Sequence, residues 1–159
     1  MKYLPPIIIF LLLSSANLLA QKKKEVKQHK IKSSYTTVTE NGKTINEDKS
    51  VFDAKGNEIE KTNYNKEGVL TSVVKFKYNG EGDAVEELEY DAKNSLKEKR
   101  VMKYNGLGEK TEELVYDKDD KLLKKHSYTY DGKGLKTERK TVDASGKIIS
   151  VKKYGYEFK

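Results

Sequence analysis

An apolar residue, in most cases a tyrosine followed by Asp or Asn, recurs along the chain at spacings that alternate between 14 and 12 residues. These anchors are Val38, Phe52, Tyr64, Tyr78, Tyr90, Tyr104, Tyr116, Tyr130, Val142 and Tyr156. Four residues after each anchor up to Val142 stands a Gly, Asn or Asp, and these residue types tolerate a positive φ. The stretches between turns are roughly seven to nine residues long, which is typical of strands. The pattern therefore predicts hairpins whose loops contain a type I turn followed by a left-handed residue with a bulge.

The strand register also follows from this pattern. Each anchor is expected to pair with the residue six positions later, so Tyr64, Tyr90, Tyr116 and Val142 face Leu70, Leu96, Leu122 and Ile148. Strict alternation would place Phe76, Met102, Tyr128 and Tyr154 on the same face. It would also oppose opposite charges at Glu86/Arg100 and Glu138/Lys152, and pair Glu112 with His126.

These features predict an all-β fold, an antiparallel β-hairpin meander of about nine or ten strands built from 26-residue repeats. An open or partly curled sheet and a closed up-and-down barrel both fit the strand count. The pair Glu86/Arg100 lies in the middle of the expected Tyr/Leu face, and burying it inside a small barrel would be costly. This favours the open sheet.

The amino end has the pattern of a secretory signal peptide over residues 1–20. Lys2 gives a positive start, residues 7–13 form an apolar run, and Ala20 ends a small-residue cleavage site. The run is far shorter than the roughly 20 residues that an uncleaved membrane anchor needs. We expect a basic flexible linker over 21–34 and the repeat domain over 35–159. An exported protein of the periplasm, outer surface or medium of a bacterium is predicted.

Composition limits the kind of fold further. Only 42 of the 139 residues after residue 20 are apolar, which predicts a thin core. There is no cysteine, so no disulfide supports the fold.

Residues 21–32 carry a net charge of +5 and residues 33–159 about +1, so the basic character belongs to the linker. The linker could contact anionic lipid, polysaccharide or nucleic acid, but a solvated segment is the simpler interpretation. Export and the near-neutral repeats disfavour nucleic acid.

Candidate catalytic chemistry is sparse. The chain has two histidines, His29 in the linker and His126 with an expected cross-strand partner, and no cluster with zinc spacing. The acidic segment 117–120 lacks the glycine and distal glutamate of a calcium loop. We predict no catalytic residue, no cofactor and no metal site.

The tyrosines are the best candidates for binding. Successive turns lie on alternating edges of a meander, so two rows are expected, one of Tyr64, Tyr90 and Tyr116 and one of Tyr78, Tyr104 and Tyr130. Neighbours within a row would be about 10 Å apart, two strand separations. Such rows could stack on sugars or grip a protein, or they could simply pack on the leucines of each hairpin.

Two segments carry a family resemblance. Residues 76–86 and 128–138 resemble the aromatic-x-Tyr-Asp-x-x-Gly-x-x-x-Glu pattern of the tyrosine-aspartate (YD, or Rhs-type) repeats, and the resemblance extends over about 38–158. It implies a bacterial, exported or surface-associated protein built of β-hairpin repeats, for which carbohydrate binding has been proposed. The chain differs at Asn94, Asp120 and Val142, and it is too short to enclose a toxin as large members do.

Together these observations predict a non-enzymatic cell-envelope module that binds a glycan or an envelope protein, with membrane contact only through the signal peptide. A small-molecule carrier with a closed barrel is one alternative. An immunity-like partner of a toxin, implied only by the family resemblance, is the other.

Overall fold

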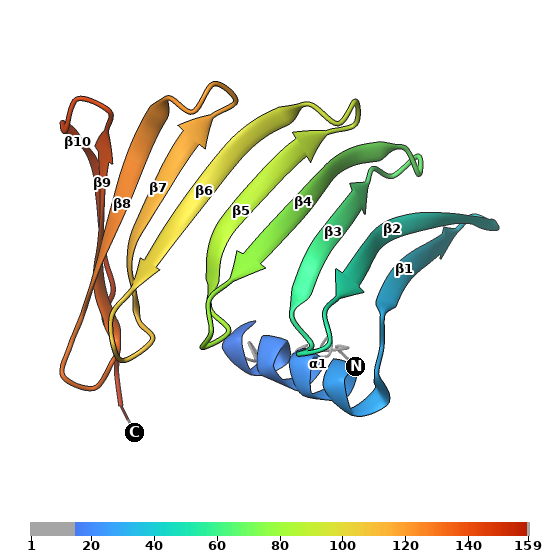
Figure 1. The fold of residues 1–159 in the computed structure, drawn as a ribbon, viewed down its shortest axis with the longest axis horizontal. Coiled ribbons are helices and arrows are strands. Elements are labelled where there is room, and N and C mark those ends of the chain that lie inside the picture. Colours follow the sequence, from blue (N-terminus) through green and yellow to red (C-terminus); the bar gives the residue numbers. More distant parts are fainter. Residues whose placement is uncertain (1–14, 159) are drawn as a thin grey trace, which may run out of the picture.

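The computed structural model describes residues 15–158 and shows one antiparallel sheet of ten strands in chain order. Figure 1 shows them side by side as a single curved sheet. The strands are β1 (Ser33–Glu40), β2 (Lys43–Phe52), β3 (Glu58–Tyr64), β4 (Leu70–Tyr78), β5 (Ala84–Asp91), β6 (Leu96–Tyr104), β7 (Lys110–Asp117), β8 (Leu122–Tyr130), β9 (Lys136–Asp143) and β10 (Ile148–Lys153). The predicted meander is confirmed. The closed-barrel alternative is wrong, because β1 and β10 lie at opposite ends of the sheet.

The hairpin loops have the predicted local chemistry. In the β3–β4 loop, the Asn65 side-chain oxygen accepts hydrogen bonds from the backbone N–H groups of Glu67 and Val69, at 3.0 and 2.9 Å. Gly68 has a φ of 79°, and its N–H donates to the Asn65 carbonyl at 2.9 Å. The same arrangement recurs in later loops, with Asn94 and Asp120 in the left-handed region. The first hairpin differs, because Asn41 and Gly42 form a two-residue turn in which both have positive φ.

A β-bulge next to the loops changes the register that strict alternation predicts. The anchor pairs are as expected, for instance Tyr90 opposite Leu96, but the next pair is Glu89 opposite Glu98, so Lys97 is an extra residue. All later pairs are shifted by one. The predicted charge pairs are therefore wrong: the observed partners are Glu86–Val101, Glu87–Arg100, Glu112–Ser127, Glu113–His126, Arg139–Lys152 and Glu138–Lys153.

The bulge also corrects the prediction that Phe76, Met102, Tyr128 and Tyr154 share a face with the anchors Tyr64, Tyr90 and Tyr116. Tyr116 lies opposite Lys99, and Met102 is three residues beyond Lys99, so Tyr116 and Met102 point to opposite sides of the sheet. We call these sides the Tyr90 face and the Met102 face. Tyr64, Tyr90 and Tyr116 lie on the first, whereas the Met102 face carries Phe76, Met102, Tyr128 and Tyr154.

The buried core is a thin layer on the Met102 face. Phe52 and Met102 are each 7% exposed and Val115 is 1% exposed. Val115 lies between Arg100 on β6 and Lys124 on β8. In a single-layered sheet, the aliphatic stems of such long side chains cover the apolar groups while their charged ends stay in water.

The basic segment forms a helix, α1 (Ser15–His29), in place of the expected flexible linker. Figure 1 shows α1 beneath the edge of the sheet that carries the β2–β3 and β4–β5 loops. Val26 is 4% exposed, and its carbonyl accepts a hydrogen bond from the N–H of Ile31 at 2.9 Å. The Lys22 ammonium lies 3.3 Å from Glu58 and 5.2 Å from the centre of the Phe52 ring. Tertiary contacts therefore order this segment.

The predicted signal peptide lies largely outside the described residues, since it covers 1–20 and the description begins at residue 15. The helix runs across the predicted cleavage position after residue 20. Within residues 15–158, no helix is both long and apolar enough to span a membrane.

Candidate functional site: grooves between hairpin loops

Two equivalent grooves lie on the edge of the sheet below which α1 is placed, which we call the α1 edge. One groove, of 680 Å³, lies between loops 79–83 and 105–109, and the other, of 610 Å³, lies between loops 105–109 and 131–135. All ten lining positions of the first recur 26 residues later in the second, as Asn105, Leu107, Glu109, Thr111, Tyr128, Thr129, Tyr130, Asp131, Gly132 and Gly134. The repeat therefore builds the same groove twice.

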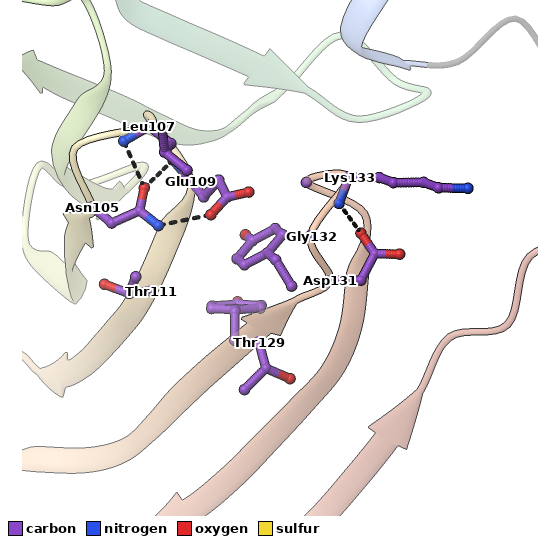
Figure 2. A pocket seen from close by; sticks show the side chains of 11 residues that line it. Asn105, Leu107, Glu109, Thr111, Thr129, Asp131, Gly132 and Lys133 are labelled. Carbon is purple, nitrogen blue, oxygen red and sulfur yellow. Dashed lines mark hydrogen bonds between the residues drawn. The ribbon is translucent and has the colours of Figure 1, made fainter.

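Loop side chains orient the polar groups of the second groove. The Asn105 side-chain oxygen accepts from the N–H groups of Leu107 and Glu109, each at 3.0 Å, and its amide nitrogen donates to the Glu109 carboxylate at 2.7 Å. On the facing loop, Asp131 accepts from the N–H of Lys133 at 2.9 Å. Figure 2 shows Asn105 and Glu109 on one side and Asp131 and Lys133 on the other. An amide and carboxylates are thus held in place at the groove.

The row of Tyr78, Tyr104 and Tyr130 lies along this edge and forms a ladder of hydrogen bonds between hairpins. Each hydroxyl donates to the backbone carbonyl 20 residues earlier: Tyr78 to Glu58 at 2.7 Å, Tyr104 to Ala84 at 2.9 Å, Tyr130 to Lys110 at 2.9 Å and Tyr156 to Lys136 at 2.8 Å. Burial, assisted by the charge of Glu58, raises the pKa of Tyr78 to about 12. The hydroxyls therefore have a structural role, while Tyr104 and Tyr130 also line the grooves.

The second predicted row, Tyr64, Tyr90 and Tyr116, lies on the Tyr90 face beside the opposite loops. Its rings are half-buried. The Lys75 ammonium lies 5.2 Å from the ring centre of Tyr90, and that of Lys99 lies 5.1 Å from the ring centre of Tyr116. The structure thus separates the two rows by face and by edge, so they do not form one site.

Charged groups in the middle of the Met102 face pair with one another. Arg100 lies 2.6 Å from Glu98 and 3.6 Å from Glu87. Burial raises the pKa of Glu87, although Arg100 acts in the opposite direction. Among the described residues, no group of three or more His, Asp or Glu side chains could hold a metal ion. This face is therefore held together by internal ion pairs.

His126 lies beside this ion-pair cluster on the Met102 face. Its Nδ1 is 2.8 Å from the Thr141 hydroxyl, and His126 is opposite Glu113. Burial lowers the pKa of His126, whereas Glu113 raises it. The imidazole is therefore part of the sheet's own hydrogen bonding.

The space between loops 53–57 and 79–83 is the counterpart of the two grooves, but α1 covers part of it. Lys22 and Lys23 line the remaining volume of 280 Å³ together with Gly56, Tyr78 and Gly82. An added Cβ at Gly56 would lie 2.8 Å from the Lys23 carbonyl oxygen, so the glycine permits this close contact. The grooves that α1 leaves open are therefore those of the later repeats.

The sequence analysis missed the polar side chains of the grooves. The sequence contains a pattern that could have identified them, because Asn79 and Asp83 recur as Asn105 and Glu109 at the repeat spacing. In both loops the amide donates to the carboxylate, at 3.2 and 2.7 Å.

Comparisons with known proteins show no close relationship. No protein-family model and no curated protein sequence matches the chain. A Bacteroides fragilis protein of unknown function is similar in structure, with 16% identity and a TM-score of 0.42 over 80% of this chain and 96% of that one. An S. aureus TarM mutant in complex with fondaparinux, alpha-GlcNAc-glycerol and UDP has 14% identity and a TM-score of 0.32, covering 83% of this chain and 23% of that one. A further TarM structure has 15% identity and a TM-score of 0.31, and the match again covers 23% of its chain.

Proposed function

We propose that this chain is an exported, non-enzymatic β-repeat protein of the bacterial cell envelope that binds a glycan, or an envelope protein, along its α1 edge. The observation that carries the proposal is the recurrence of the same lining positions in two grooves between successive loops. Both grooves keep a tyrosine (Tyr104 or Tyr130), a loop asparagine (Asn79 or Asn105) and the carboxylate to which that asparagine donates.

The groove chemistry suits a polymer of hydroxylated units. Each groove combines tyrosine ring surface with an amide and a carboxylate, which can accept and donate hydrogen bonds to hydroxyl groups. The grooves are two strands apart, about 10 Å along the edge. A repeating ligand that reaches both grooves gains avidity, because the second contact is intramolecular.

The non-enzymatic part of the proposal is supported by how the titratable groups are used. The carboxylate of Glu109 is held by Asn105, and that of Asp131 caps its own turn. Lys103 pairs with Glu112 at 2.8 Å. These groups are held by structural partners rather than converging on a reacting atom.

A glycan array, with a pull-down from an envelope fraction, tests the proposal. Gly132→Arg places a long side chain in the second groove, at a position that is glycine in both grooves, and should weaken binding at least tenfold. Gly80→Arg is the matched control, because Gly80 is the equivalent residue two repeats earlier and lines neither groove. Both glycines are exposed, and an added Cβ at either would meet nothing within 4 Å. Equal binding by the two folded variants would contradict the groove assignment.

The other tyrosine row supplies the alternative outcome. Tyr90→Ala with Tyr116→Ala removes two rings from the Tyr90 face and leaves the grooves intact. Loss of ligand in this variant, with normal binding by Gly132→Arg, would move the binding site to the Tyr90 face.

A further inference from the structure

The carboxyl-terminal end of the sheet exposes an unusual amount of apolar surface. Within residues 22–158, six of the ten well-exposed large apolar side chains follow residue 122. Three are on the last strand, where Ile148, Ile149 and Val151 are 56, 55 and 48% exposed. Leu123, two strands away, is 44% exposed. Figure 1 places β10 at the end of the sheet farthest from α1.

These side chains belong to the Tyr90 face. Ile148 lies opposite Val142, which lies opposite Lys125, and Val151 lies opposite Lys140. Ile149 is the extra residue of the β9–β10 bulge, as Leu123 is of the β7–β8 bulge. The two bulge residues stand at equivalent positions two strands apart, about 10 Å. They form one apolar strip, which we call the β10 corner: Leu123, Ile148, Ile149 and Val151.

Lysines surround the β10 corner. Lys140 lies directly across from Val151, and Lys153 continues the same strand. Lys125 lies across from Val142, the partner of Ile148, and is also 3.5 Å from Glu112. Residues 118–159 contain twelve Lys or Arg against six Asp or Glu, a net charge of +6. Residues 33–117 contain thirteen against eighteen, a net charge of −5. The near-neutral repeat region is therefore two halves of opposite sign, and the apolar strip is in the basic half.

Charge argues against a second copy of the chain as the occupant. Pairing of two β10 edges would join two basic ends. Pairing of β10 with β1 of another copy would also join two basic ends, because residues 27–52, which hold the end of α1 together with β1 and β2, carry five Lys against three Asp or Glu. The acidic excess of residues 33–117 lies in the strands after β2. Like charges at a contact disfavour association. The occupant should instead be anionic and should present apolar groups at the same surface.

We propose that the β10 corner binds the surface of an anionic lipid bilayer. The aliphatic side chains enter the boundary between headgroups and acyl chains, and the surrounding lysines contact the anionic headgroups. A purely electrostatic contact, with a polysaccharide or nucleic acid, would not need the exposed aliphatic strip. This contact is separate from the signal peptide and from the grooves, which lie on the α1 edge.

Vesicle co-sedimentation tests the proposal. The full chain is expressed, the recovered protein is weighed by mass spectrometry to define its amino end, and binding is measured to phosphatidylcholine vesicles with and without an equimolar share of phosphatidylglycerol. Binding to the anionic vesicles is expected to exceed binding to the neutral ones. Ile149→Ser with Val151→Ser should then weaken it about tenfold, because half-exposed aliphatic side chains lose their burial in lipid.

Val69→Ser is the control, because Val69 is 58% exposed and lies in the β3–β4 loop, away from the β10 corner. All variants share the same amino end, so any signal-peptide contribution cancels between them. Equal binding by wild type and the double variant, or equal binding to both vesicle types, would overturn the proposal. So would a concentration-dependent dimer in sedimentation velocity that Val151→Ser abolishes, because a second copy would then cover the strip.

Discussion

The tyrosine ladder can be tested by removing a single hydroxyl group. Tyr104→Phe keeps the ring that lines the groove and removes the donor to the Ala84 carbonyl, which is 2.9 Å away. Tyr116→Phe makes the same chemical change on the Tyr90 face. Within the described residues the Tyr116 ring contacts the Lys99 ammonium, at 5.1 Å, and its hydroxyl has no hydrogen-bond partner. The two variants differ in the hydrogen bond and not in the chemistry of the substitution.

The expected loss in free energy of unfolding follows from the half-buried position of Tyr104. A neutral intramolecular hydrogen bond contributes a net ~0.5–1.5 kcal/mol, and the carbonyl left behind borders an open groove that water can enter. We therefore expect Tyr104→Phe to lower the free energy of unfolding by about 1 kcal/mol. The rungs at Tyr78 and Tyr130 are in separate hairpins, so the triple Phe variant should lose about 3 kcal/mol if the effects add. Tyr116→Phe should change the free energy of unfolding by less than about 0.5 kcal/mol.

Urea unfolding followed by far-ultraviolet circular dichroism measures these differences, since the chain has no tryptophan. An unchanged m-value is required, because a change would mean that the variant unfolds in more than one step. If Tyr104→Phe and Tyr116→Phe have the same free energy of unfolding, the hydroxyl bond does not hold the hairpins together and the ladder is only a geometric coincidence.

Two further predictions concern α1 and His126. Gly56→Ala and Gly108→Ala both strain a left-handed position, with φ of 82 and 76°, but only the Cβ at 56 would meet the Lys23 carbonyl. Gly56→Ala should therefore be the less stable variant and should expose α1 to trypsin, whereas equal sensitivity would mean that α1 is undocked. Because burial lowers the pKa of His126 in the folded protein, the unfolded chain binds more protons near its own pKa of about 6.5. The free energy of unfolding should fall as pH is lowered from about 7.5 to 5.5, and His126→Gln should remove that dependence when measured in urea.

The loops and anchor pairs could be predicted because local chemistry determines them. Asn65 accepts hydrogen bonds from the N–H groups two and four residues later, and Gly68 takes the positive φ that closes the turn. Both requirements are visible in the residue types alone. The pairing of Tyr64 with Leu70 follows from the loop length.

A bulge was expected at the left-handed residue of each loop, but the further bulge directly after the partner of each anchor could not be predicted in the same way. The extra residues include Thr71, Lys97 and Leu123, which share neither size nor charge. A bulge of this kind needs no special residue type, yet one extra residue turns every later side chain to the other face. This single omission misplaced Met102 and every predicted charge pair.

The helix was missed for a different reason. Its lysine-rich sequence has little apolar periodicity, and between residues 22 and 29 the one buried side chain is that of Val26. What holds α1 is the fit of its backbone against Gly56 and of Lys22 against Phe52, partners about 30 residues away in the chain. Sequence reasoning that considers a terminal segment by itself cannot see such partners.

The β10 corner occurs where the internal contacts of the described repeats stop. In the middle of the sheet, ion pairs and the tyrosine ladder occupy the Met102 face, and Leu70, Leu96 and Leu122 are half-buried by their neighbours. Ile148 is their counterpart on β10, and it is 56% exposed because, within residues 15–158, no further strand packs beside β10. An ordinary end of a sheet would carry a polar residue at this position, since an exposed apolar edge invites unwanted pairing. Retaining isoleucine there is consistent with a surface that is covered by something other than the chain itself.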